Sequence, residues 1–101
     1  MKFNETNISG LVIIEPKVFN DTRGYFFEPY NKKKFDKYFG ITNFIQDNES
    51  KSSKGVLRGF HFQKPPFDQA KLVRCVQGEV LDVALDLRIQ SNTYGKYEKV
   101  L

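Results

Sequence analysis

The sequence predicts an all-β protein with one short helix. Fifteen per cent of its 101 residues are aromatic, ten of them phenylalanine, and aromatic side chains favour strands. Its apolar residues fall in short runs that end at proline, glycine, asparagine or aspartate, as they do in small β folds. A single segment carries the three-to-four-residue spacing of an amphipathic helix. These three observations together favour a β fold over a helical or mixed one.

The N-terminal part of the chain predicts two strands. Leu11–Ile14 is a short apolar run, which we interpret as an edge or arm strand. A turn is expected at Asn20-Asp21, because these residues favour turns. The next strand is Tyr25–Glu28, which ends at Pro29 because proline has no N–H to donate to a strand ladder.

The predicted helix follows these strands. Asn31 is placed to cap its first turn, and Gly40 is placed to end it. The lysines Lys32–Lys34 open the helix, and we interpret them as its solvated face rather than as a phosphate site. Its apolar stripe consists of Phe35, Tyr38 and Phe39.

The second half of the chain predicts a polar loop and then paired strands. The loop is Asp47–Gly55 by composition. A central strand is expected over Leu57–Gln63. Leu72–Val76 and Glu79–Leu87 are expected to pair as a hairpin joined at Gln77-Gly78.

Burial follows from the same strand pattern. A two-residue turn in that hairpin places Lys71, Asp82 and Asp86 on one face, which is either a solvent face or the lining of a cavity, and apolar side chains on the other. The single Cys75 cannot form an internal disulfide and is expected to be a small buried side chain. Core positions are also expected for Phe26, Phe60 and Phe62.

Composition narrows the possible partners. The net charge of +4 and the pI of about 9.2 favour anionic partners but do not choose among nucleic acid, membrane surface and phosphorylated metabolite. The opening ten residues contain no apolar signal-like core, and no later run reaches the length of a membrane span, so a cytoplasmic location is the default expectation. One histidine is too few for the shell of a metal-binding site in a β fold of this kind, and no metal is expected.

The only histidine, His61, lies between two cations, Arg58 and Lys71. Taken alone, a histidine is more often structural than catalytic. An imidazole near fixed positive charge nevertheless suits a base that removes a proton while the cations stabilise the resulting negative charge. Arg58 precedes His61 by three residues, so an unbroken strand would send the two side chains to opposite faces. A bulge or kink is therefore expected at Gly59.

Five segments of the chain, in order and spacing, resemble the dTDP-4-dehydrorhamnose 3,5-epimerases. They are D-T-R-G-Y-F-F-E (Asp21–Glu28), Q-D-N-E-S (Gln46–Ser50), L-R-G-F-H-F-Q (Leu57–Gln63), Q-A-K-L-V-R (Gln69–Arg74) and G-E-V-L-D-V-A-L-D-L-R (Gly78–Arg88). The resemblance covers essentially the whole chain. It implies a cupin-type jelly roll, of which residues 1–101 correspond to the N-terminal half: a single domain, truncated relative to the family.

The resemblance also implies roles for individual residues. It assigns catalysis to His61, as the general base, and to Lys71, which lies near the developing enolate. The hairpin register further suggests that Asp82 and Asp86 hold Lys71 charged and oriented. The family's proton-donating tyrosine lies beyond Leu101, and no tyrosine of this chain stands in the matching motif. The substrate-binding positions that the resemblance implies are Arg23, Glu28, Gln46, Asp47, Asn48, Arg58 and Lys71.

By resemblance, the activity is 3,5-epimerisation of dTDP-4-dehydro-6-deoxy-D-glucose to dTDP-4-dehydro-L-rhamnose in dTDP-L-rhamnose biosynthesis. It requires no cofactor. The implied assembly is a homodimer with N-terminal strand exchange, and no nucleic acid or membrane partner is expected. The alternatives are an epimerase acting at one carbon, a keto-isomerase on a related sugar nucleotide, and a non-catalytic sugar-nucleotide-binding fragment. A basic nucleic-acid-binding protein is a further option, but the aromatic residues follow core periodicity rather than a stacking surface.

Overall fold

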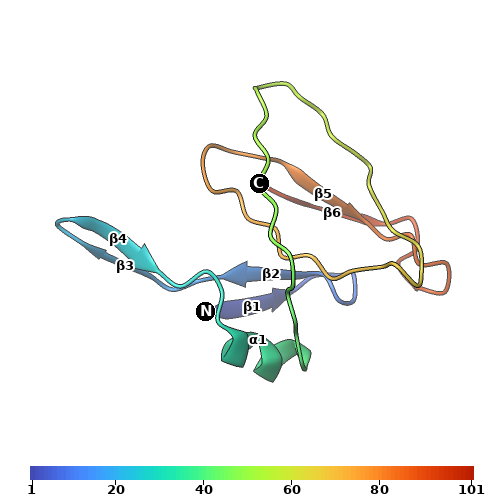
Figure 1. Cartoon of the computed structure of the whole chain (residues 1–101). Coiled ribbons are helices and arrows are strands. Elements are labelled where there is room, and N and C mark those ends of the chain that lie inside the picture. Colours follow the sequence, from blue (N-terminus) through green and yellow to red (C-terminus); the bar gives the residue numbers. More distant parts are fainter. The chain divides into compact units, whose positions relative to one another are not determined.

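The computed structural model describes all of Met1–Leu101, in two compact units (Figure 1). The first unit consists of Met1–Asn43 together with Glu79–Leu101, and the second is Phe44–Gly78. Every strand and the single helix belong to the first unit. The six strands form three two-stranded antiparallel sheets, so the predicted all-β fold with one short helix is confirmed.

The first sheet pairs β1 (Lys2–Glu5) with β2 (Val12–Glu15), which confirms the strand predicted near Leu11–Ile14. The turn between them is held by Thr6, whose hydroxyl donates to the Leu11 carbonyl at 2.9 Å. The strand β1 is not evident from the sequence pattern. Its residues K-F-N-E carry one apolar side chain, too few to show a strand pattern by themselves.

The second sheet is a hairpin of β3 (Val18–Asp21) and β4 (Gly24–Phe27). The prediction of a turn at Asn20-Asp21 is wrong, because the two turn residues are Thr22-Arg23. The Asp21 carboxylate accepts a hydrogen bond from the Arg23 backbone N–H at 2.8 Å, so it supports the turn from the last position of the strand.

The helix α1 (Lys32–Phe39) has the predicted ends. Asn31 Oδ1 accepts from the Lys34 backbone N–H at 3.1 Å, as an N-cap does, and Gly40 ends the helix with a φ of 82°. The lysines Lys32–Lys34 are exposed, which confirms their interpretation as a solvated face. The helix is too short and too polar to cross a membrane.

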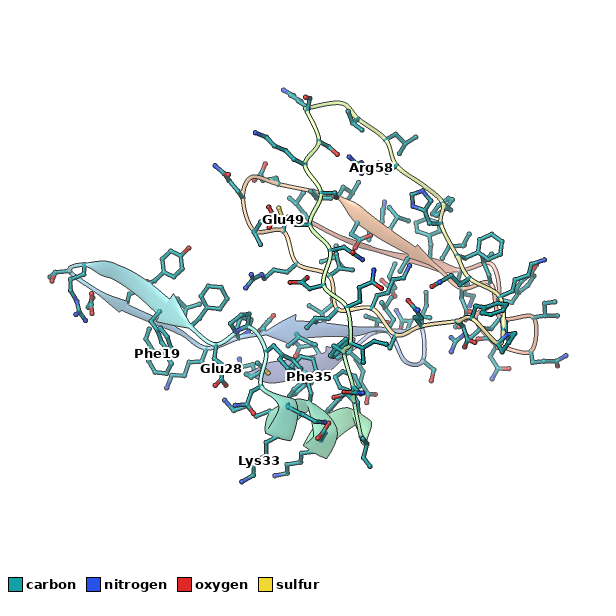
Figure 2. The ribbon with its side chains drawn as sticks, in the orientation of Figure 1. Phe19, Glu28, Lys33, Phe35, Glu49 and Arg58 are labelled. Carbon is teal, nitrogen blue, oxygen red and sulfur yellow. The ribbon has the colours of Figure 1, made fainter.

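Aromatic side chains join α1 to β1. Phe35 is 1% exposed, and its ring meets that of Phe3 edge-on at a centroid distance of 5.7 Å and that of Tyr30 at 4.8 Å. Figure 2 shows Phe35 on the side of α1 that faces the first sheet. Phe3 also stacks on Tyr38 at 4.4 Å. This cluster is the core of the first unit. The buried apolar side chains of the unit are Phe35, within the cluster, and Ile8.

The third sheet pairs β5 (Asp82–Leu85) with β6 (Tyr97–Val100). The predicted hairpin of Leu72–Val76 with Glu79–Leu87 is therefore wrong. Leu72–Val76 forms no strand, and the chain only bends at Gln77-Gly78. Strand pairing depends on which segments meet in space, and the turn signal in the sequence does not determine that.

The second unit, Phe44–Gly78, contains turns but no strand or helix, so the prediction of a central strand over Leu57–Gln63 is wrong. A strand needs a neighbouring backbone to bond, and this segment pairs with none. The irregularity expected at Gly59 is present in another form: its φ of 130° lies outside the range of regular strands and favours glycine.

Few side chains are buried in either unit. Cys75 is exposed, and so are Phe26, Phe60 and Phe62, so their predicted burial is wrong. The chain exposes 9654 Å². A folded monomer of 11.8 kDa exposes only about 5,900 Å². The apolar side chains that alternate along the predicted strands therefore have no opposing layer here to bury them.

Replacing Phe35 by alanine should lower the free energy of unfolding by about 3 kcal/mol, because it removes the most buried ring of the aromatic core. Urea unfolding followed by far-ultraviolet circular dichroism measures this loss. The matched control is Phe39→Ala in the same helix, where the ring is 41% exposed and the expected cost is about 1 kcal/mol. Equal costs for the two variants would contradict this account of the core.

Candidate functional site

The predicted site residues are divided between the two units. Arg23 and Glu28 belong to the first unit. The second unit carries Gln46, Asp47, Asn48, Arg58, His61 and Lys71. All of these residues except Glu28, which is half-buried, are exposed to solvent.

Arg23 lies at the tip of the β3–β4 hairpin. Its guanidinium binds the Asp21 carboxylate, with Nη2 at 2.6 Å and Nε at 3.2 Å from Oδ2. This pairing lowers the pKa of Asp21 and raises the pKa of Arg23. The Arg23 side chain is nevertheless 88% exposed, so its head is held in place while open to a ligand.

Glu28 follows β4 and connects that strand to the helix. Its carboxylate accepts from Lys34 Nζ at 2.6 Å and from Asn31 Nδ2 at 3.1 Å. The bond from Lys34, followed by that from Asn31, lowers the pKa of Glu28. Because Asn31 also caps α1, Glu28 supports the start of the helix in addition to any contact with substrate.

In the second unit, three predicted residues make local bonds. Gln46 Nε2 donates to Asn48 Oδ1 at 3.1 Å. Arg58, labelled in Figure 2, donates from Nε to Ser52 Oγ at 2.9 Å and from Nη2 to the Lys51 carbonyl at 3.0 Å. Arg58 thereby closes the loop that precedes it in the sequence.

His61 and Lys71 are exposed. No hydrogen bond or ion pair joins either of them to the other or to Arg58. Their assembly into one site, with His61 as base, therefore stays a prediction.

Asp86 has a partner set that the sequence analysis missed. It is 4% exposed, and its carboxylate accepts from Arg88 Nε and Nη2, each at 2.8 Å. The hydroxyls of Ser91 and Thr93 donate to it at 2.6 Å and 2.7 Å. These donors, Arg88 first, hold the pKa of Asp86 far below its usual range. We call this group the Asp86 cluster.

The Asp86 cluster corrects the predicted role of this aspartate. We expected Asp86 to orient Lys71, but its oxygens are taken by the turn that follows β5. The hairpin from which that role was inferred is absent. The signal for the actual role was the run D-L-R-I-Q-S-N-T, in which one cation and two hydroxyls follow the aspartate closely enough to fold back on it.

One further surface feature is lined by none of the predicted residues. A hollow of about 390 Å³ is lined by Met1, Phe3, Lys34, Lys37 and Tyr38, none of which the sequence analysis assigned to the site. No group of three or more histidine, cysteine, aspartate or glutamate side chains is arranged to hold a metal ion.

The sequence profile of one protein family, described as dTDP-4-dehydrorhamnose 3,5-epimerase, matches residues 5–101. A protein of that name from Shigella flexneri is 54% identical over 98 residues, which are 96% of this chain and 54% of the relative. One from Methanothermobacter thermautotrophicus is 50% identical over 98% of this chain and 53% of its own length. The chain thus spans about half the length of the curated relatives it matches.

Solved structures agree with these sequence matches. A crystal structure of a dTDP-4-dehydrorhamnose 3,5-epimerase from Elizabethkingia anophelis superposes with a TM-score of 0.90 at 54% identity, covering 99% of this chain and 55% of the other. One from Bacillus anthracis, solved with TDP and PPi bound, gives 0.91 at 41% identity, covering 98% and 57%. These superpositions agree with the predicted fold class, a partial jelly roll.

Asp86→Asn should loosen the β5–β6 hairpin, because an amide cannot accept all the donors of the Asp86 cluster. The lowered pKa means that the stabilising effect of the carboxylate is fully present well above its ordinary pKa of 3.8 and is lost progressively as the pH falls from there toward the lowered pKa. After correction for intrinsic rates, amide hydrogen exchange of Asp82–Leu85 and Tyr97–Val100 should therefore be slower in the parent chain than in the variant at pH 5, and this difference should shrink as the pH falls toward 3. Equal protection in the two proteins would contradict this role.

Proposed function

The chain belongs to the dTDP-4-dehydrorhamnose 3,5-epimerase family, and from this premise we propose that it takes part in 3,5-epimerisation of dTDP-4-dehydro-6-deoxy-D-glucose, a step toward dTDP-L-rhamnose. The observation that supports the proposal best is the family match over residues 5–101, together with 54% identity to an epimerase over a region that includes His61, Arg58 and Lys71.

The proposed chemistry is proton transfer at the two carbons that flank the 4-keto group. His61 removes the proton from C3 or C5, and the electron pair of the C–H bond moves into an enolate. Lys71 and Arg58 place positive charge near the enolate oxygen, where it stabilises the developing negative charge. An acid on the other face of the ring then returns a proton with inversion. No electrons leave the sugar, so the reaction needs no redox cofactor.

Arg23 is the first of the proposed nucleotide contacts. Arg23 suits a diphosphate because a guanidinium offers paired donors at fixed geometry, and its head is exposed. Glu28, Gln46, Asp47 and Asn48 are the other proposed contacts. The Bacillus anthracis relative, solved with TDP and PPi, shows that a protein with this fold accommodates such groups.

Three alternatives differ from this proposal in defined ways. An epimerase acting at one carbon, or a keto-isomerase, would differ in the sugar pocket and in the acid that returns the proton. None of the tyrosines of this chain stands in the motif of that acid. A non-catalytic nucleotide-binding fragment would bind thymidine diphosphate without exchanging substrate protons.

The proposed assembly is a homodimer with exchange of N-terminal strands, and the proposed location is the cytoplasm. The exposed aromatic side chains of the β3–β4 hairpin, Phe19, Tyr25 and Phe26, support the assembly, because such a surface favours association.

Light scattering of the chain should therefore give twice the monomer mass of 11.8 kDa. A monomer at all concentrations would count against the dimer.

His61→Ala should slow proton exchange at C3 and C5 of the 4-keto sugar nucleotide by about 10²- to 10⁴-fold, the usual contribution of a general base. NMR in heavy water measures the exchange at each carbon directly. Lys54→Ala, an exposed lysine in the same unit, is the matched control and should not change the rate. Exchange at one carbon only would favour the single-carbon epimerase, and binding without exchange would favour the non-catalytic fragment.

A further inference from the structure

The guanidinium of Arg23 presents two edges that can donate hydrogen bonds, and the Asp21 carboxylate binds one of them. The side edge, Nε and Nη2, binds Asp21 Oδ2 at 3.2 Å and 2.6 Å. A guanidinium has five N–H groups, and these two bonds use two of them. The end edge, both N–H groups of Nη1 and the second one of Nη2, keeps its donors. A paired set of donors thus remains for one further anion.

Asp21 is itself held by the turn that carries Arg23. It is the last residue of β3, opposite Gly24 in the ladder, and its Oδ1 accepts from the Arg23 backbone N–H at 2.8 Å. One carboxylate therefore binds Arg23 at the backbone and at the head of the side chain. The long side chain between these two points loses much of its rotamer freedom before any ligand binds.

We propose that Asp21 is a positioning residue, which fixes the side edge of Arg23 so that the end edge is aimed at the diphosphate of the nucleotide ligand. This inference rests on the proposed function, which gives Arg23 the diphosphate. Its benefit is preorganisation: a side chain already ordered in the free protein costs less entropy to order on binding.

The negative charge of Asp21 also has an opposing effect, because it repels the diphosphate. Its side chain is 50% exposed and that of Arg23 is 88% exposed, so water and salt screen this repulsion. Screening also limits the strength of the Asp21–Arg23 pair itself. The orienting effect, which depends on geometry rather than on long-range charge, prevails, and the net benefit is modest.

The test is calorimetric titration of thymidine diphosphate into the chain. Asp21→Asn keeps an oxygen for the Arg23 backbone N–H but removes the charged partner of the guanidinium. The expected result is affinity weaker by about two- to five-fold, the range of an exposed ion pair. Glu15→Gln is the control: it removes an equal charge from the exposed end of β2, where no contact with Arg23 exists, and should leave affinity unchanged or slightly higher.

A double-mutant cycle separates positioning from a general loss of structure. Lysine has no second edge to aim, so in an Arg23→Lys background the change Asp21→Asn should have no further effect on affinity. A merely structural role for Asp21 would weaken binding equally in both backgrounds.

The remaining outcomes distinguish failure of the positioning role of Asp21 from failure of the proposed role of Arg23. If Asp21→Asn binds as tightly as the parent chain or more tightly, while Arg23→Ala binds weakly, Asp21 does not position Arg23 and only this inference fails. If Arg23→Ala binds normally, or the parent chain does not bind thymidine diphosphate, the proposed role of Arg23 fails, and the inference fails with it.

Discussion

The packing of Phe35 against Phe3 is the contact on which the first unit depends. It joins the helix to the first strand, and the other rings of the cluster, those of Tyr30, Tyr38 and Phe39, close around this pair. Without it, α1 would be an eight-residue helix with nothing to pack on, and helices of that length are not stable alone in water. The position of Glu28 follows from the same contact, because its partners Asn31 and Lys34 belong to the start of that helix.

Carboxylates order the segments that this small core does not reach. Asp21 holds the turn of the β3–β4 hairpin, and Asp86 holds the turn that follows β5. Asp36 holds the segment after α1, since it accepts from Lys32 Nζ and from the backbone and hydroxyl of Thr42, and these bonds lower its pKa to about 2. Each acts over a few residues, and one carboxylate accepts several donors at once. Local polar bonding therefore determines the shape of the turns, among them the turn that carries Arg23.

Features encoded over a few neighbouring residues could be predicted from the sequence. The helix is the clearest case, because its cap at Asn31, its apolar stripe and its end at Gly40 all lie within ten residues. The pairing of β5 with β6 was not predictable in this way, because Tyr97–Val100 carries no strong strand pattern. The turn signal at Gln77-Gly78 favoured a different hairpin. The family and its motif residues could be read from five short segments. Local patterns contain no information on how residues far apart in the sequence come together, so the assembly of these residues into a site could not be predicted from the sequence.

The large exposed surface also affects how the first unit responds to temperature. The heat-capacity change of unfolding arises mainly from apolar area newly exposed to water, and Phe35 and Ile8 are the only buried apolar side chains here. The heat-capacity change should accordingly be small, and with it the enthalpy and the cooperativity of unfolding. Thermal melting of such a chain is broad, with a gradual loss of order over a wide temperature range.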